Sequence, residues 1–280
     1  MLVYDTPAPI SVSLGLGFAA ATVHVVAEAR GDTEVDVRPA KAGRSADRKI
    51  AEQTVVEFAD GVLSLRAPKV GVVGRHGAID VTLKLPEGSA VHGETGMGEV
   101  TSRGRLGEFR FVSGYGDIRV DDASVLRVES SSGDLAVGRA DRAEIVVRDG
   151  TVQVEVADGP VTAETSNGDI QIGEARGEVR ATSENGRVEV GRALGDVIAR
   201  TVNGNIRIGE ARGGEVRLDS SDGSLDIGLA EGVAARLDLD TTGGRLRNEL
   251  TNSPAPAAGS GTISVRMRTS NGDIVVRRAG

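Results

Sequence analysis

Three aspartates are the first candidates for chemistry in this sequence. Asp219, Asp238 and Asp240 fall at outward positions of a repeated strand pattern, where they could lie close together on neighbouring repeats. Polysaccharide-cleaving enzymes use such carboxylate pairs, one as acid and one as base or nucleophile. A glycan cleft would also need an aromatic stacking platform, for which Tyr115 is the candidate. These four residues define one hypothesis, a carbohydrate-binding or carbohydrate-cleaving β-helix.

Other catalytic patterns are missing from the sequence. The histidines His24, His76 and His92 are scattered without the spacing of a metal site or a paired catalytic base. There is no P-loop, nucleophile elbow or dinucleotide fingerprint, and the chain has no cysteine. The Asn-Gly-Asp segments at 167–169 and 271–273 resemble part of a calcium-binding repeat, but one carboxylate per repeat makes a poor calcium site. We therefore expect no enzyme, no catalytic residue, no cofactor and no metal.

Charge and hydropathy narrow the class of partner and the location. A formal net charge of −8 argues against binding to nucleic acid, which needs clustered Lys and Arg. No stretch approaches the ~18 apolar residues of a transmembrane segment. The first twenty residues alternate like a strand and lack the basic and apolar regions of a signal peptide. These features predict a cytoplasmic protein with no transmembrane segment.

Glycines at a nearly constant spacing organise the sequence. We take as anchors Gly98, Gly116, Gly133, Gly150, Gly168, Gly186, Gly204, Gly223, Gly244 and Gly272, which follow one another at 18, 17, 17, 18, 18, 18, 19, 21 and 28 residues. An aliphatic residue stands two positions after every anchor, from Val100 and Ile118 to Leu246 and Ile274. A second stands four positions after it, except at Ser102 and Asn248. Because polar residues alternate with these positions, each anchor begins a half-buried strand.

A second strand precedes each anchor, with inward residues seven and five positions before it, such as Val179 and Ala181, or Leu237 and Leu239. Asn-Gly or Asp-Gly marks one turn, and Gly-Glu-Ala-Arg-Gly marks the other. Asn-Gly between strands is also typical of a hairpin, so an antiparallel meander is the structural alternative. We favour a parallel coil because the whole repeat recurs, which places like residues over like, including an Asn ladder at Asn167, Asn185, Asn203 and Asn271.

A hydroxyl series stands three positions before the anchors. Its members are Thr95, Ser113, Ser130, Thr165, Ser183, Thr201, Ser220, Thr241 and Thr269, interrupted by Val147. A regular threonine array can line a binding surface, but the parity of these positions points inward. We expect hydroxyls that cap turn amides at a corner.

The two ends of the chain depart from the regular pattern. Residues 1–90 predict an irregular β cap, with strands at 22–26, 34–37 and 79–85, a polar stretch at 40–53 that ends in a short helical turn at 45–53, a loop at 68–77, and the repeat pattern around Gly61. Residues 91–280 predict regular repeats with a loop insertion at 251–261, and the whole chain is expected to be one continuous unit. Arg277 and Arg278, which follow the last strand, are expected to blunt an open edge.

Several segments resemble a known family. They are the opening Tyr-Asp-Thr-Pro-Ala-Pro-Ile-Ser-Val, the repeated Asn-Gly-Asp/Asn-Ile-x-Ile-Gly-Glu-Ala-Arg-Gly, the stretch from Gly232, and the final Arg-Thr-Ser-Asn-Gly-Asp-Ile-Val-Val-Arg-Arg. Together they resemble the bacterial β-strand-repeat family of unknown function known as the putative adhesin family, over nearly the whole chain. The resemblance implies a β-helical fold and carries no catalytic residues.

The sequence therefore predicts an all-β protein: a parallel, by default right-handed, β-helix or β-solenoid with rungs of about 18 residues and two strands per rung. The leading functional hypothesis is a non-enzymatic scaffold or protein-interaction module that binds a protein partner or its own copies through its faces or ends. The carbohydrate hypothesis is the alternative. A third, an acidic mimic of nucleic acid, would need a continuous negative stripe, and the interspersed arginines argue against it.

Overall fold

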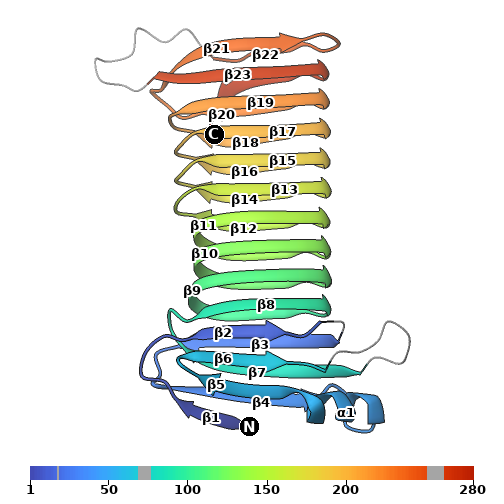
Figure 1. The fold of residues 1–280 in the computed structure, drawn as a ribbon. Coiled ribbons are helices and arrows are strands. Elements are labelled where there is room, and N and C mark those ends of the chain that lie inside the picture. The colour runs from blue at the N-terminus through green and yellow to red at the C-terminus, as the bar shows by residue number, and fades with distance from the viewer. Residues whose placement is uncertain (18, 69–76, 251–261) are drawn as a thin grey trace. The chain divides into compact units, whose positions relative to one another are not determined.

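The chain folds almost entirely into β-strands (Figure 1). The computed structural model describes residues 1–17, 19–68, 77–250 and 262–280. Within these residues, 24 strands belong to one hydrogen-bonded sheet, and there is one helix, α1 (Ser45–Gln53). No helix in the described part of the chain is long and apolar enough to cross a bilayer. The chain divides into two compact units, 1–140 and 141–280, and the boundary between these ranges falls within the residues of strand β11 (Leu135–Asp149).

The second unit repeats a pair of strands. Its elements after β11 are β12 (Val152–Ala157), β13 (Val161–Asn167), β14 (Ile170–Ala175), β15 (Val179–Asn185), β16 (Val188–Ala193), β17 (Val197–Asn203), β18 (Ile206–Ala211), β19 (Glu215–Asp222), β20 (Leu225–Leu229), β21 (Ala234–Thr241), β22 (Leu246–Asn248), β23 (Thr262–Asn271) and β24 (Ile274–Arg278).

Most strands of this unit pair in parallel with the strand two places further along the chain. β13, β15, β17 and β19 form one stack, in which Val161, Val179, Val197 and Val216 stand opposite one another. β12, β14, β16, β18 and β20 form the other in the same way. Aliphatic residues therefore lie over their counterparts, and the four valines are at most 1% exposed. The antiparallel meander is thus wrong for this unit.

Stacked glycines make the corner between the two strands of each pair. A Cβ on Gly186 would lie 2.0 Å from the carbonyl oxygen of Gly168, closer than real Cβ contacts come. Gly168 also has a φ of 155°, which side-chain-bearing residues rarely adopt. The backbone amide of Gly168 donates to the carbonyl oxygen of Asn185 at 3.0 Å. The Asn-Gly dipeptide thus turns a corner between parallel stacks and does not form a hairpin.

The other predicted turn is partly strand. Gly-Glu-Ala of the Gly-Glu-Ala-Arg-Gly segment belongs to β14 and β18, which run on to Ala175 and Ala211. Ala175, Ala193 and Ala211 are at most 1% exposed and form a third inward column, at positions that the sequence pattern assigns to a turn.

The last pair of strands is inserted between two earlier pairs. β23 pairs with β19 on one side and β21 on the other, and β24 lies between β20 and β22 in the same way. The prediction that the last strand forms a charged edge is therefore wrong. Arg277 forms an ion pair with Asp226 at 2.9 Å, and Arg278 donates to the carbonyl oxygens of Ala230 and Val233.

The pair β21 and β22 is outermost among the described strands of this unit. Leu246, predicted to point inward, is 53% exposed, and Leu237 and Leu239 are only half-buried. Their counterparts one pair inward, Val265 and Ile274, are at most 1% exposed. The predicted loop at 251–261 lies outside the described residues.

The first unit combines parallel and antiparallel pairing. Its elements are β1 (Leu2–Asp5), β2 (Ser11–Gly15), β3 (Ala20–Glu28), β4 (Asp32–Pro39), α1, β5 (Val55–Ala59), β6 (Val62–Arg66), β7 (Ala78–Pro86), β8 (Ala90–Met97), β9 (Val100–Tyr115), β10 (Ile118–Ser132) and the start of β11. β2 lies between β6 and β8, and β3 between β7 and β9, all parallel. β1, β4 and β5 add antiparallel partners. The predicted strands at 22–26, 34–37 and 79–85 and the helix at 45–53 are confirmed.

The repeat pattern around Gly61 is a different structure. Asp60 and Gly61, with φ of 51° and 74°, join β5 and β6 in an antiparallel hairpin. Two consecutive positive φ values are typical of the tight hairpin turn that Asp-Gly favours. The interpretation of this segment as a degraded copy of the repeat is therefore wrong. Residues 69–76 of the predicted loop lie outside the described residues.

Candidate functional site

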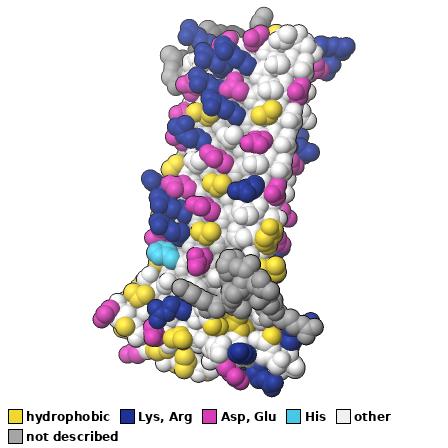
Figure 2. Space-filling view, turned by 45° about the vertical axis from the view of Figure 1, so that its right-hand side comes forward, with side chains coloured by type: hydrophobic (Ala, Val, Ile, Leu, Met, Phe, Trp, Pro, Cys, Tyr) yellow, Lys and Arg dark blue, Asp and Glu magenta, His cyan; other side chains and the backbone are white. Residues whose placement is uncertain are grey.

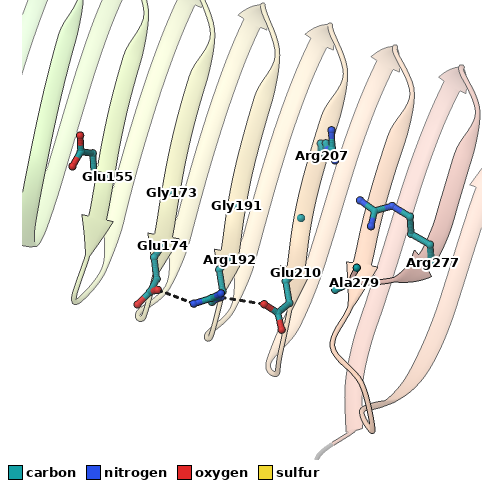
Figure 3. A pocket seen from close by; sticks show the side chains of 11 residues that line it. Glu155, Gly173, Glu174, Gly191, Arg192, Arg207, Glu210, Arg277 and Ala279 are labelled. Atoms are coloured by element: carbon teal, nitrogen blue, oxygen red, sulfur yellow. Dashed lines mark hydrogen bonds and ion pairs between the residues drawn. The ribbon is translucent and has the colours of Figure 1, made fainter.

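An open groove with a backbone floor lies on the second unit, across β14, β16 and β18 (Figure 3). The fifth residue after three successive anchors is Gly173, Gly191 or Gly209. A Cβ on Gly191 would lie 2.5 Å from the carbonyl oxygen of Gly173, and one on Gly209 equally close to that of Gly191. Close backbone stacking thus excludes side chains, and the hollow has a volume of about 630 Å³.

One wall of the groove is a chain of ion pairs. Glu174, Arg192 and Glu210 stand opposite one another on β14, β16 and β18. Arg192 donates to Glu174 at 3.2 Å and to Glu210 at 3.1 Å, as the dashed lines in Figure 3 show. Glu174 also accepts from Arg176 at 2.9 Å. This hydrogen bond lowers the pKa of Glu174 and raises the pKa of Arg176.

The other wall carries polar groups with no partner. Gln171, Glu189 and Arg207 stand opposite one another on the same three strands. Arg207 lines the hollow described above, whereas Gln171 and Glu189 line an adjoining one, and the two hollows together form the groove. Among the described residues, no hydrogen bond or ion pair engages the side chain of Glu189 or Arg207. A second hollow of about 350 Å³ continues past Gln153 and Gln171. The groove therefore has one charge-neutral wall and one wall with free hydrogen-bonding groups.

The ends of the groove carry opposite charges. Glu155 occupies the position of the floor glycine on β12, and no described side chain pairs with it. At the other end, Arg277 stands opposite Gly228 and is held by Asp226. A polar molecule in the groove would meet a free carboxylate at one end and guanidinium groups from Arg207 and Arg277 at the other.

The predicted carboxylate cluster does not form. The inserted strand β23 places Arg268 between Asp219 and Asp240, and Arg266 opposite Asp238. Asp238 accepts from Arg266 at 2.8 Å, and Asp219 pairs with Arg200 at 3.6 Å. Each acid therefore faces a cation where an acid–base pair would need a second carboxylate. Acidic and basic side chains are likewise interspersed over the face drawn in Figure 2.

The aromatic and histidine candidates are also dispersed. Tyr115 is 60% exposed at the end of β9 in the first unit, whereas the three aspartates belong to the second. His24 is exposed on β3, and the Nε2 atom of His92 lies 3.3 Å from Oε2 of Glu108. His76 lies outside the described residues. Across the described ranges, no group of three His, Asp or Glu side chains could hold a metal ion.

The predicted Asn ladder is confirmed. Asn185 donates its side-chain amide to Asn167 at 3.0 Å, and Asn203 donates to Asn185 at 2.8 Å. Asn271 donates to Asp222 at 2.7 Å, because Asp222 holds the Asn position of β19. The ladder is exposed and its amides bond to one another from strand to strand.

The hydroxyl series points inward, as predicted, but its bonding differs. Ser183, Thr201 and Ser220 donate to the carbonyl oxygen of the preceding anchor glycine, each at 3.1 Å. They were expected to accept from turn amides. The amides are already engaged by the next anchor corner, so the hydroxyls bond the carbonyl oxygens that remain.

Sequence reasoning missed the groove, although a signal was present. Glycine follows the second aliphatic residue in Ile-Gln-Ile-Gly, Val-Glu-Val-Gly and Ile-Arg-Ile-Gly of three consecutive repeats. Glycine inside a strand often marks close backbone approach. These glycines were attributed to the turn.

Several solved bacterial structures are distantly similar to this chain. No family model matches the sequence, and no curated protein matches it significantly. The chain is similar in structure to a "putative adhesin" from Bacteroides fragilis, with 13% identity, 98% of this chain and 95% of that chain covered, and a TM-score of 0.39. A "putative adhesin" from Parabacteroides merdae has 11% identity, coverages of 81% and 91%, and a TM-score of 0.38. A "putative cell adhesion protein" from Clostridium sporogenes has 10% identity, coverages of 99% and 98%, and a TM-score of 0.22. Two of these three structures carry the name putative adhesin, which is also the name of the family that the sequence resembles.

Proposed function

We propose that this chain is a non-enzymatic binding scaffold that holds a protein partner along the groove of β14, β16 and β18. The observation that carries the proposal is the contrast between the two groove walls. Glu174, Arg192 and Glu210 neutralise one another, whereas Glu189 and Arg207 have no described partner. Charged groups held at fixed positions on paired strands, beside a floor without side chains, suit recognition of a complementary polar surface.

The proposal includes the finer architecture and the location. The parallel stacks support a solenoid of two strands per rung that is continuous over the chain, and right-handed coiling is the default for parallel connections. An irregular cap over residues 1–90 and regular rungs over 91–280 remain part of this proposal. So do a cytoplasmic location in a bacterial cell and self-association through faces or ends, which is the alternative mode of binding.

Charge reversal in the groove tests this function. The double variant E189R/R207E exchanges the two free charges, and E164R on β13 is the matched control because Glu164 is exposed and has no described partner. Size-exclusion chromatography with light scattering measures self-association, and immobilised protein measures capture of a partner from lysate. We expect an interaction that persists in the E164R variant and is lost in the E189R/R207E variant. A strict monomer that retains no partner, or an interaction unaffected by E189R/R207E, would contradict the proposal.

Carbohydrate binding is the second candidate, and one observation favours it. Gln153, Gln171 and Glu189 line the second hollow with amide and carboxylate groups, which suit hydroxyl-rich ligands. Cleavage has no such support, since β23 places Arg268 between Asp219 and Asp240, and Asp238 is paired with Arg266. A glycan array with the wild type and Q171A distinguishes the two: binding that Q171A weakens supports carbohydrate, and no binding to any glycan excludes it.

A further inference from the structure

Four Asn-Gly dipeptides in the second unit share one latent reaction. They are Asn167-Gly168, Asn185-Gly186, Asn203-Gly204 and Asn271-Gly272. In such a pair the backbone nitrogen of glycine can attack the side-chain carbonyl carbon of asparagine, because glycine has no side chain to obstruct the approach. A backbone amide that is held in a hydrogen bond must first be released before it can attack. The state of each glycine amide therefore determines which asparagine reacts.

Three of the four glycine amides are engaged by the next rung. Gly168 donates to Asn185 O at 3.0 Å, Gly186 to Asn203 O at 3.0 Å, and Gly204 to Asp222 O at 2.9 Å. Neighbouring bonds hold these corners on both sides: Val188 donates to Asn205 O at 3.0 Å just after Gly186. Releasing any of the three amides requires opening a corner inside the stack.

The fourth amide is different. Among the described residues, no acceptor bonds to the backbone N–H of Gly272. The cause is the outermost turn, where Gly243 donates to Ser270 O at 2.7 Å and does not present the acceptor found in the regular corners. Regular pairing resumes at Ile274, which donates to Arg245 O at 2.9 Å. The side chain of Asn271 is exposed to water, so the break in the ladder coincides with a solvent-accessible amide.

We propose that Asn271 is a site of spontaneous deamidation in the folded protein. The nitrogen of Gly272 forms a bond to Cγ of Asn271, the Cγ–Nδ2 bond breaks, and ammonia leaves with the proton that Gly272 releases. Water then opens the resulting cyclic imide. Attack at Cγ yields aspartate, and attack at the backbone carbonyl carbon yields isoaspartate. No oxidant, metal or enzyme takes part.

Deamidation of Asn271 would change the contacts of the inserted strands β23 and β24. Asn271 now donates to a carboxylate oxygen of Asp222 at 2.7 Å, and deamidation replaces this donor with a second carboxylate. Like charges at this range repel. Isoaspartate also lengthens the backbone by one carbon between β23 and β24, where the register on both sides is fixed. Modification of Asn271 should therefore loosen the pair β23 and β24.

Peptide mapping tests the proposal within one molecule. The full chain is incubated at mildly alkaline pH in water enriched in ¹⁸O. Only the aspartate and isoaspartate that form from the imide during the incubation then carry the label. Trypsin then releases the four sites in separate peptides, 149–176, 181–187, 201–207 and 269–277. We expect peptide 269–277 to gain label about fivefold faster than the other three, because the net cost of opening one hydrogen bond, near 1 kcal/mol, corresponds to roughly that ratio. The same chain unfolded in urea should label all four at similar rates.

Two results would overturn the proposal. One is a labelling rate of peptide 269–277 equal to or below that of the three ladder peptides in the folded chain. The other is no labelling of any peptide in the folded chain over a period in which the unfolded chain labels all four. The variant N271Q, whose longer side chain disfavours the cyclic imide, should lose the fast label and thereby confirms the assignment within peptide 269–277.

Discussion

Replacing Gly204 with alanine should unfold the second unit much more easily. The new Cβ would lie 2.0 Å from the carbonyl oxygen of Gly186, whereas real Cβ contacts essentially never fall below 3.0 Å. Gly204 does not have a left-handed φ, so the substitution tests rung spacing and not backbone conformation. The corner must open by about 1 Å, the difference between the two distances, which takes neighbouring hydrogen bonds beyond their normal range.

Three hydrogen bonds join this corner to the preceding one. Gly186 donates to Asn203 O and Val188 donates to Asn205 O, both at 3.0 Å, and Thr201 Oγ1 donates to Gly186 O at 3.1 Å. At about 1 kcal/mol each, their loss costs about 3 kcal/mol, and overpacking adds roughly 1 kcal/mol or more. We therefore expect G204A to lower the free energy of unfolding by about 4 kcal/mol.

The measurement is urea unfolding followed by circular dichroism, with G213A as the matched control. A Cβ on Gly213 meets nothing closer than Leu194 O at 3.7 Å, so G213A should change stability by less than about 1 kcal/mol. A loss in G204A no larger than that in G213A would refute the argument that stacked carbonyls exclude side chains at the anchors.

Three further predictions concern other layers of the second unit. In urea unfolding, Leu225→Ala should lower the free energy of unfolding by about 2–5 kcal/mol, and Leu246→Ala by less than about 1 kcal/mol. Both residues stand two positions after an anchor, but Leu225 is 0% and Leu246 is 53% exposed. Equal losses in the two variants would contradict the exposure of the outermost pair of strands. Thr201→Val should cost about 1 kcal/mol in the same assay through its lost hydrogen bond, and no loss would show that the hydroxyl bond contributes nothing. Arg176→Gln should raise the pKa of Glu174 toward its ordinary value of 4.5, measured by carboxyl NMR titration, and an unchanged pKa would refute the assigned cause. Since folding lowers this pKa, the pair's contribution to stability is present above pH 4.5 and is lost as pH falls through the folded pKa.

The regular part of the fold could be predicted because two periods agree. Alternation within strands identifies inward residues such as Ile170 and Ile172, and the 18-residue step sets the register between rungs. Parallel pairing of identical repeats follows from this step, and the Asn ladder follows from the pairing. The helix Ser45–Gln53 was also correct, because polar residues there break the strand alternation.

The order of the last two rungs could not be predicted, because both carry the inward pattern that β19 requires. Val265 and Met267 fit over Val216 and Leu218, and Leu237 would fit the same stack. Nothing local distinguishes the two arrangements. One signal was present: the second aliphatic position after Gly244 is Asn248, a polar residue whose side chain is exposed on β22. The error extended to the candidate site, because placing β23 between β19 and β21 separates Asp219 from Asp240.

The charge pattern of the groove bears on how the proposed partner is recognised. A perfect repeat would stack like charges directly over one another, which destabilises paired strands. The chain avoids this by alternating sign between rungs, as in Glu174, Arg192 and Glu210, so these side chains satisfy one another. Across from them, Glu189 and Arg207 also alternate in sign, and neither side chain pairs with a described residue. Recognition by this face should therefore depend on a few side chains and not on net charge. Salt should weaken binding at Glu189 and Arg207 while leaving the fold, which depends on aliphatic stacking, intact.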